Sequence, residues 1–254
     1  MSELGPLLDA LEEKKAVTIG TWHFWLGKFG EKSAIVSLTE VGPMNATAAT
    51  VLAIERWQPR VILNQGTSGA HDRRLQVRDI VLGLKNVEFN AYKTEAAGPG
   101  KGSSLSRVIP STTKMRIGSL ENRVGFTSFP GSPTLAEQAL RVKYDKGRVM
   151  TGVVGSGHQW NREIDRIEWL RKTYGSDVED MESAYVAAVA YAFQIPFLSV
   201  RIVSDSEFHS PEFIRETGSD CAEFVLDFIR ALTLTGVKPP SSSETVDDLQ
   251  PSLR

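Results

Sequence analysis

The stretch that decides the fold is DVEDMESAY (residues 177–185), which an alanine- and valine-rich run connects to PFLSVRIVSD (residues 196–205). This pattern predicts the end of a strand, a helix, a turn and a second strand. Glu182 lies where the first strand passes into the helix, and Asp205 lies where the second strand ends. Ligands of open α/β sheets bind at the carboxyl ends of strands. Two acidic residues at that edge of the sheet therefore indicate a ligand-binding site rather than a solvated surface.

Strands and helices alternate along the rest of the chain. We expect further strands at residues 16–19, 34–38, 60–64, 79–84 and 147–154, and helices at residues 3–14, 42–57, 132–143, 160–173 and 213–232. This alternation favours an α/β fold with three layers, α/β/α, around a central sheet. We expect residues 1–235 to form a single domain, and the polar, Pro/Ser-rich residues 236–254 to be a disordered tail.

The least readable region is residues 86–130, within which the glycine- and serine-rich residues 98–104 are expected to be loop. Residues 65–70 are small and polar and follow an expected strand, so they too are assigned to a loop. Long loops inside compact domains are often functional or mobile. The sequence gives no role to residues 86–130.

Composition limits the classes of partner. The chain has 254 residues, 41% of them hydrophobic, and a formal net charge of −2, which gives no electrostatic case for binding nucleic acid or a membrane. No apolar run approaches the roughly 20 residues of a membrane helix. The chain opens with an acidic, amphipathic segment instead of a signal peptide. Its single cysteine, Cys221, excludes an internal disulfide. We expect a cytoplasmic protein with neither nucleic acid nor membrane as partner.

Two glycine-containing segments follow expected strands. In GTSG (residues 66–69) small residues allow backbone amides to approach a ligand, although an ordinary turn explains the segment equally well. In GSGHQWN (residues 155–161) Trp160 offers a flat apolar face to a base or sugar, and the alternative is a core tryptophan beside a turn.

Glu179, Asp180 and Glu182 form an acidic cluster before a helix. Acids near a helix N-terminus are favoured by the helix dipole, which explains Glu179 or Asp180 well and Glu182 less well. No histidine or cysteine stands at metal-ligand spacing from them. We therefore expect no metal and no cofactor.

Ser204 and Asp205 end the second strand. Asp205 is either the N-cap of a following helix or a general acid whose pKa is raised by burial. Arg201 faces the same side of this strand as Asp205, because side chains alternate along a strand. A buried arginine needs a carboxylate or a ligand as partner.

Together these segments resemble the nucleoside phosphorylase/nucleosidase superfamily and, within it, the 5′-methylthioadenosine/S-adenosylhomocysteine nucleosidases. The matching motifs occur in order at residues 41–46, 64–69, 75–81, 156–161, 180–182 and 201–205. The resemblance implies a mixed, partly barrel-like sheet and a homodimer or higher homo-oligomer. It also implies hydrolysis of the N-glycosidic bond of a purine nucleoside, 5′-methylthioadenosine and/or S-adenosylhomocysteine, to adenine and the thioribose.

The resemblance also implies roles for residues at the two ends of a nucleoside. Asp205 matches the acid that protonates the purine at N7, and Ser204 would orient it. Glu182 matches the carboxylate that holds the ribose hydroxyls, while Met181 packs under the sugar. Trp160 matches an aromatic ring against the base.

Further matches complete the expected site. The backbone of Asn161 would read the base edge, and Phe213 is a further substrate-binding candidate. Thr67 and Arg201 match residues near the attacking water. Glu3 matches the carboxylate that activates this water.

One departure from the family and two alternatives remain. The family begins with a strand before the helix that bears the water-activating glutamate, whereas this chain begins inside that helix. Either its start has been placed too late or the first strand is absent, and a missing central strand would expose a sheet edge. A purine or uridine nucleoside phosphorylase, with phosphate as nucleophile, is the first alternative. A non-catalytic nucleoside-binding or storage protein of the same fold is the second.

Overall fold

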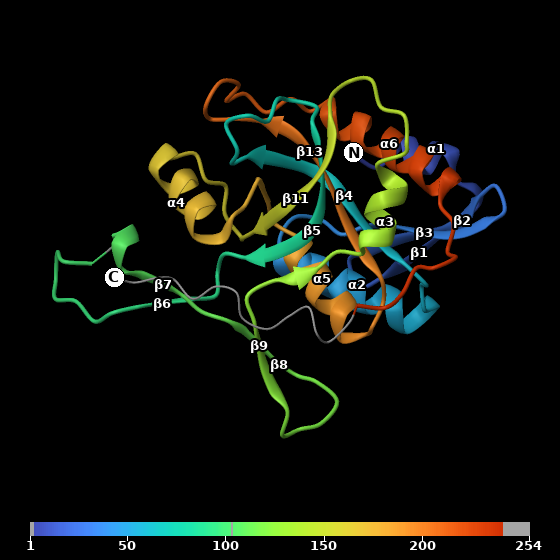
Figure 1. Cartoon of the computed structure of the whole chain (residues 1–254). Coiled ribbons are helices and arrows are strands. Elements are labelled where there is room, and N and C mark those ends of the chain that lie inside the picture. Colours follow the sequence, from blue (N-terminus) through green and yellow to red (C-terminus); the bar gives the residue numbers. More distant parts are fainter. Residues whose placement is uncertain (1–2, 103, 241–254) are drawn as a thin grey trace.

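The centre of the molecule is a closed sheet built around β13 (Phe197–Asp205). The computed structural model describes residues 3–102 and 104–240, and within it every residue of β13 is buried. β13 pairs in parallel with β4 (Ile62–Ala70) and antiparallel with β5 (Ile80–Glu88). From β5 the sheet continues through β11 (Val149–Ser156) and β12 (Val178–Asp180) back to β4. Five strands thus form a mixed, barrel-like sheet (Figure 1).

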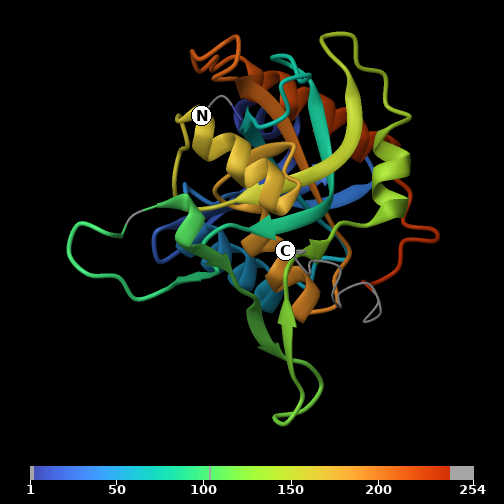
Figure 2. The same cartoon turned by 60° about the vertical axis from the view of Figure 1, so that its left-hand side comes forward.

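Helices cover this sheet on more than one side (Figures 1 and 2). On one side, α1 (Gly5–Ala10), α3 (Pro133–Ala139) and α6 (Thr217–Ala231) share a core with Leu198 and Ile202 of β13. On another side, α2 (Pro43–Trp57) packs on α5 (Ser183–Ala192), and α5 contacts β5, β10 (Phe129–Pro130), β11 and β13. α4 (Ile164–Tyr174) packs its Leu170 and Tyr174 against Val87 and Phe89. The expected α/β fold, with helices on either side of a mixed, partly barrel-like sheet, is confirmed.

An antiparallel meander follows α1. It consists of β1 (Glu12–Ile19), β2 (Trp22–Phe29) and β3 (Lys32–Leu38), joined by two-residue turns at which Gly20 and Gly30 adopt positive φ. The prediction of a helix over residues 3–14 is wrong beyond Ala10, because residues from Glu12 onward pair with β2. The sequence analysis also missed β2 altogether.

Most of residues 86–130, which the sequence left without a role, lie in two hairpins that project from the body between β5 and β10 (Figures 1 and 2). In the first, β6 (Tyr92–Thr94) pairs with β7 (Val108–Pro110), and the short helix η1 (Leu105–Arg107) lies between them. In the second, β8 (Thr113–Arg116) pairs with β9 (Arg123–Phe126). Phe126 and Phe129 at the base of the second hairpin enter the core under α5.

Three boundaries matter for the site. Residues 65–70 are strand, not loop, because the ladder with β13 continues to Gly69 and that with β12 to Ala70. α4 begins at Ile164 and α6 at Thr217, so Trp160 and Phe213 lie in the loops that precede these helices. Both aromatic residues are about half exposed there.

The N-terminal residues lie beside β4. Over the described residues, β4 pairs with β12 only at Gly69 and Ala70, so most of its length has a strand on one side only. On this strand the Gln65 side chain donates to the carbonyl of Glu3, 2.6 Å away. This side of β4 is therefore an open sheet edge among the described residues, and Glu3 lies against it.

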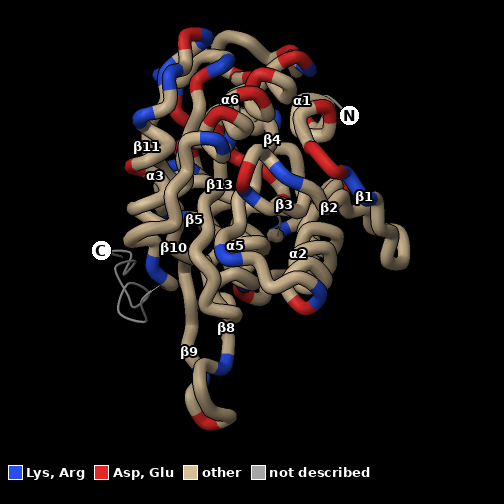
Figure 3. The backbone as a smooth tube through the Cα atoms, turned by 90° about the vertical axis from the view of Figure 1, so that its right-hand side faces the viewer, with Lys and Arg blue, Asp and Glu red and all other residues tan. Residues whose placement is uncertain are grey.

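Other expectations meet the structure only in part. The domain boundary at residue 235 stays a prediction, and most of the expected tail, residues 241–254, lies outside the described residues. Across the two described ranges, no helix combines the length and apolar character needed to cross a membrane. Acidic and basic residues are interspersed along the backbone (Figure 3).

Candidate functional site

The site is assembled by the register of two neighbouring strands. β13 sets Arg201 beside Gly66 and Ile202 beside Thr67 of β4. The register shifts between Val203 and Asp205, so that Asp205 pairs with Gly69 and Ser204 is the extra residue. Such irregularities re-aim side chains near active sites. Two motifs far apart in sequence therefore meet at one edge of the sheet.

Arg201 forms the buried centre of this site. Its Nε lies 2.7 Å from Asp180 Oδ2 and donates to Ser183 Oγ at 3.0 Å, and its Nη2 donates to Asn64 Oδ1. Nη1 lies 3.5 Å from Glu182 Oε2. A Cβ on Gly66 would lie only 2.6 Å from Arg201 Nη1, so glycine is required for this close approach. The expectation that a buried arginine has a carboxylate partner is confirmed.

Removing Arg201 leaves Asp180 buried without its cation. We expect Arg201→Met to lower the free energy of unfolding by about 3–5 kcal/mol, the usual cost of breaking a buried ion pair from one side. Urea unfolding of the variant measures this loss. The double variant Arg201→Met/Asp180→Asn should recover part of it, because the unpaired charge is gone. A double variant no more stable than the single one would contradict this account.

Glu182 lies at the N-terminus of α5, as the sequence predicts. Its Oε1 accepts the backbone N–H of Gly42 at 2.8 Å, which ties the site to the start of α2. Gly42 has φ +94, a conformation that other residues rarely adopt. Burial raises the pKa of Glu182, the nearby Asp180 charge raises it further, and Arg201 opposes both. Met181, half-buried, precedes it between β12 and α5.

Glu3 joins the same group of side chains. Its Oε1 accepts both the backbone N–H and the hydroxyl of Thr67, each at 2.8 Å. A Cβ placed on Gly66 would lie 3.3 Å from this same oxygen and 2.6 Å from Arg201 Nη1. Glu3, Thr67 and Arg201 thus surround Gly66, as expected for residues around one small molecule.

Asp205 lies at the far end of β13, and its side chain is oriented by its neighbour. Ser204 Oγ donates to Asp205 Oδ1 at 2.6 Å. Burial raises the pKa of Asp205, while the Ser204 hydroxyl and the Trp160 side chain lower it and the charges of Glu207 and Glu179 raise it. An acid with a raised pKa, at the end of a strand, suits proton donation.

Trp160 and Phe213 flank this end of the site. Their rings meet edge to face with centroids 6.4 Å apart, and the Arg162 guanidinium lies 5.6 Å from the Trp160 ring. Neither ring is buried in the core, which excludes the alternative of a core tryptophan. The two rings are therefore placed to contact a flat ligand.

Asn161 differs from its expected role. Its backbone N–H donates to Glu179 Oε1 at 2.8 Å, and its side-chain amide donates to Glu179 Oε2 at 2.5 Å. The N–H that the sequence analysis assigned to the base edge is thus already engaged, and that role stays a prediction.

A family model described as the phosphorylase superfamily matches residues 2–233. The chain belongs to this superfamily. It is 24% identical over 233 residues to a 5′-methylthioadenosine/S-adenosylhomocysteine nucleosidase of Staphylococcus carnosus, an alignment that covers 89% of this chain and 94% of that one. It is 27% identical over 221 residues to a nucleosidase of the same name from Marinomonas sp., with 81% and 86% covered.

Solved structures agree on the fold. The nucleosidase of the same name from Neisseria meningitidis, in complex with methylthio-immucillin-A, superposes with a TM-score of 0.73 at 22% identity. The match covers 91% of this chain and 95% of that structure. The family model thus confirms the expected superfamily, and the superposition confirms the expected fold.

In this phosphorylase-superfamily chain, sequence reasoning missed several residues of the site. Asp180 was assigned to helix capping; it does accept the N–H of Ser183, but it is also the closest carboxylate to Arg201. Asn64 was predicted to end a strand and to begin one of the matching motifs, but it was given no role in the site. A polar residue that ends an apolar run next to a glycine could have indicated its position in the site.

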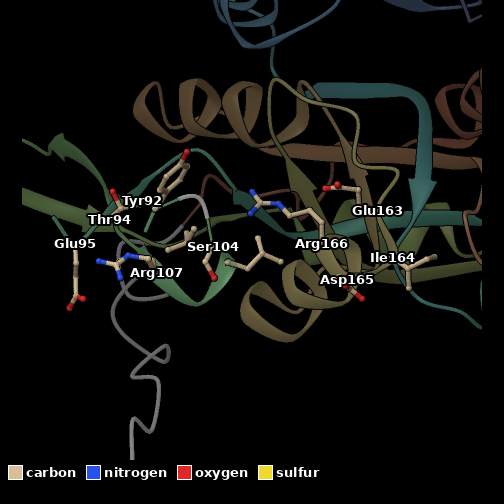
Figure 4. A pocket seen from close by; sticks show the side chains of 12 residues that line it. Tyr92, Thr94, Glu95, Ser104, Arg107, Glu163, Ile164, Asp165 and Arg166 are labelled. Carbon is tan, nitrogen blue, oxygen red and sulfur yellow. The ribbon is translucent and has the colours of Figure 1, made fainter. Parts of the chain in front are cut away.

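One hollow of the molecule lies away from these residues. It encloses about 820 Å³ between the first hairpin and the start of α4, and Tyr92, Thr94, Glu163 and Arg166 are among the side chains around it (Figure 4). None of the expected site residues lines it. Among the described residues, no group of three or more His, Cys, Asp or Glu side chains is arranged to hold a metal.

Proposed function

We propose that this protein hydrolyses the N-glycosidic bond of 5′-methylthioadenosine and/or S-adenosylhomocysteine, giving adenine and the thioribose. The observation that carries the proposal is the grouping of Glu3, Arg201 and Glu182 around the middle of two paired strands, β4 and β13, with the buried carboxyl of Asp205 where β13 ends. The names of the relatives from Staphylococcus carnosus and Marinomonas sp. support the substrate class.

The chemistry suits these residue types. Cleavage of the bond builds positive charge on the ribose and negative charge on the leaving base. Asp205, whose pKa is raised by burial, donates a proton to the base at N7. Glu182 holds the ribose hydroxyls, and carboxylates near the sugar stabilise its developing positive charge. The arrangement resembles the two carboxylates of glycosidases.

Glu3 activates the attacking water with Thr67 beside it. Glu3 accepts two hydrogen bonds from Thr67, which fix one carboxylate oxygen and leave the other for water. Trp160 lies against the base with Phe213 beside it, and Met181 packs under the sugar. Ser204 orients the acid. The reaction requires no cofactor and no metal.

Chromatography of separate incubations with methylthioadenosine, S-adenosylhomocysteine, inosine and uridine, with and without phosphate, tests the function. Adenine should appear from the first two substrates in phosphate-free buffer. Base release that requires phosphate would establish the phosphorylase alternative. Binding of a nucleoside without any base release would establish the storage alternative.

Glu182→Gln should harm ribosides more than 2′-deoxyribosides. The carboxylate accepts charge-assisted hydrogen bonds from the ribose hydroxyls, which are stronger than neutral ones. A 2′-deoxyriboside makes fewer of them, so it loses less when the charge is removed. The ratio of kcat/KM for the two substrates, measured in both proteins, checks the expectation. Equal losses on both substrates would refute this role for Glu182.

We also propose a cytoplasmic location and a homodimer or larger homo-oligomer, in which a partner chain completes the site. Val41 and Met44 lie on either side of Gly42, whose N–H binds Glu182, and their side chains are 65% and 76% exposed. Apolar surface is therefore exposed beside the residue proposed to hold the ribose. Light scattering on the purified chain measures the oligomer, and fractionation of the source cells tests the location. A monomer with full activity would contradict the proposal that a partner chain completes the site.

A further inference from the structure

Glu179 is a buried carboxylate that the proposed mechanism does not use. It belongs to β12 and is 6% exposed. Both its oxygens are engaged by one residue, since Oε1 accepts the Asn161 backbone N–H and Oε2 accepts the Asn161 side-chain amide. A buried carboxylate is costly unless it is paired or hydrogen-bonded. These two bonds therefore stabilise one conformation of the loop that precedes α4.

His71 lies behind this carboxylate. It is 1% exposed, and its Nε2 lies 3.1 Å from Glu179 Oε2 without the alignment of a hydrogen bond. Its Nδ1 lies 2.8 Å from Ser176 Oγ, and its ring stacks on Phe89 with an interplanar angle of 7°. Ser176 and Phe89 thus fix the imidazole, which in turn limits where the Glu179 carboxylate can lie.

Glu179 is also a neighbour of the proposed acid. A Cβ on Gly69 would lie 3.3 Å from Asp205 Oδ2 and 3.8 Å from Glu179 Cγ, so the two acidic side chains flank this glycine. Asp205 faces charges from several elements: Glu179 on β12, Glu207 on the following loop and Arg162 next to Asn161. Glu207 is paired with Arg162 at 2.6 Å, whereas no lysine or arginine among the described residues forms an ion pair with Glu179.

We propose that Glu179 is a positioning residue for the base end of the site: it holds Asn161, and with it the loop that carries Trp160, beside Asp205, with His71 as its support. The proposal rests on the proposed function in taking Asp205 as the acid. Asp180 and Glu182 contact Arg201, and Glu182 also binds the start of α2. The proposal gives a function to Glu179, the third acid of this cluster. It also explains why the Asn161 N–H is not free for the base.

Hydrogen exchange of the Asn161 amide tests the positioning without reference to activity. Glu179→Ala removes the acceptor, so this amide should exchange about tenfold to a hundredfold faster, as a lost hydrogen bond to a charged acceptor implies. Glu179→Gln should retain protection, because its amide oxygen can still accept the N–H. Asn161→Ala, which loses only the side-chain bond, should exchange at an intermediate rate. Unchanged exchange in Glu179→Ala would overturn the proposal.

Kinetics test whether the positioning serves the reaction. Glu179→Ala should raise KM about tenfold, because the aromatic loop is released, and Glu179→Gln should restore it. Both variants remove a negative charge near Asp205, which lowers its pKa, so the alkaline limb of kcat/KM should move to lower pH in both. Glu207→Gln is the matched control: it removes another charge that faces Asp205 but no bond to Asn161. This variant should move the alkaline limb of kcat/KM to lower pH and leave KM unchanged.

The two tests separate this proposal from the proposed function. If the wild-type protein releases no base from any nucleoside, the function fails, and the exchange of the Asn161 amide still decides the role of Glu179. If the wild type is active and Glu179→Ala keeps the wild-type KM and pH profile, Glu179 is only structural. His71→Phe keeps the stacking on Phe89 and removes the contact with Glu179. It should raise KM in the same direction as Glu179→Ala, and an unchanged KM would remove His71 from the proposal.

Discussion

Replacing Asp205 with asparagine should slow glycosidic bond cleavage by roughly 10²–10⁴-fold, the usual contribution of a general acid, while the protein remains folded. The asparagine has the same shape and can still accept from Ser204, which lies 2.6 Å from the carboxyl. It has no acidic proton to give to the purine. The loss should therefore fall on the chemical step and leave binding of the base close to normal.

Single-turnover measurements with 5′-methylthioadenosine separate this chemical step from product release. Ser204→Ala is the matched control, because it removes the orienting hydroxyl and leaves the acid in place. It should cost much less than Asp205→Asn. Turnover of Asp205→Asn close to that of the wild type would remove Asp205 from its role.

The same residues set the dependence on pH. Asp205 must be protonated to act, and its raised pKa keeps it protonated to higher pH than an ordinary aspartic acid. Glu182 must be ionised to accept the ribose hydroxyls, and its raised pKa means that binding is lost at a higher pH on acidification than for an ordinary glutamic acid. A plot of kcat/KM against pH should therefore be bell-shaped, with Glu182 on the acidic limb and Asp205 on the alkaline limb.

Short-range patterns predicted the part of the fold that carries the acids. The run from Asp177 to Asp205 forms strand, helix and strand, with Glu182 and Asp205 at the expected ends. Here local signals agree with the tertiary structure, because a buried strand is continuously apolar and the helix begins where the acids end. The collinear motifs also identified the superfamily.

What the sequence could not predict depends on long-range pairing. GTSG was assigned to a loop because small residues have weak strand preference, yet β13 provides the partners that make it strand. The engagement of Asn161 by Glu179 joins residues 18 positions apart that lie on opposite sides of α4 in the sequence, and Asn161 itself lies in a loop. The strands of the two hairpins within residues 86–130 have only three or four residues each, too few for hydrophobic periodicity to separate them from loop.

Glu3→Gln should slow hydrolysis by roughly 10²–10⁴-fold, the range expected when a general base is lost. The glutamine still accepts from Thr67 but cannot take a proton from water. The nearby Arg201 is not free to bind an anion, because its guanidinium already contacts Asp180, Asn64, Ser183 and Glu182. A phosphate dianion entering this site would therefore meet the carboxylates of Glu3 and Glu182 without an unpaired cation to offset them.

Adenine and free thioribose should accordingly form in phosphate-free buffer, and added phosphate should not accelerate the wild-type enzyme. Glu3→Gln should lose activity equally with and without phosphate, because no phosphate-dependent route exists. Thr67→Val is the matched control, since it removes one hydrogen bond to Glu3 and keeps the carboxylate. If Glu3→Gln gained activity when phosphate was added, the carboxylate would be a barrier to phosphate in a phosphorylase site. A sugar 1-phosphate product would identify that reaction directly.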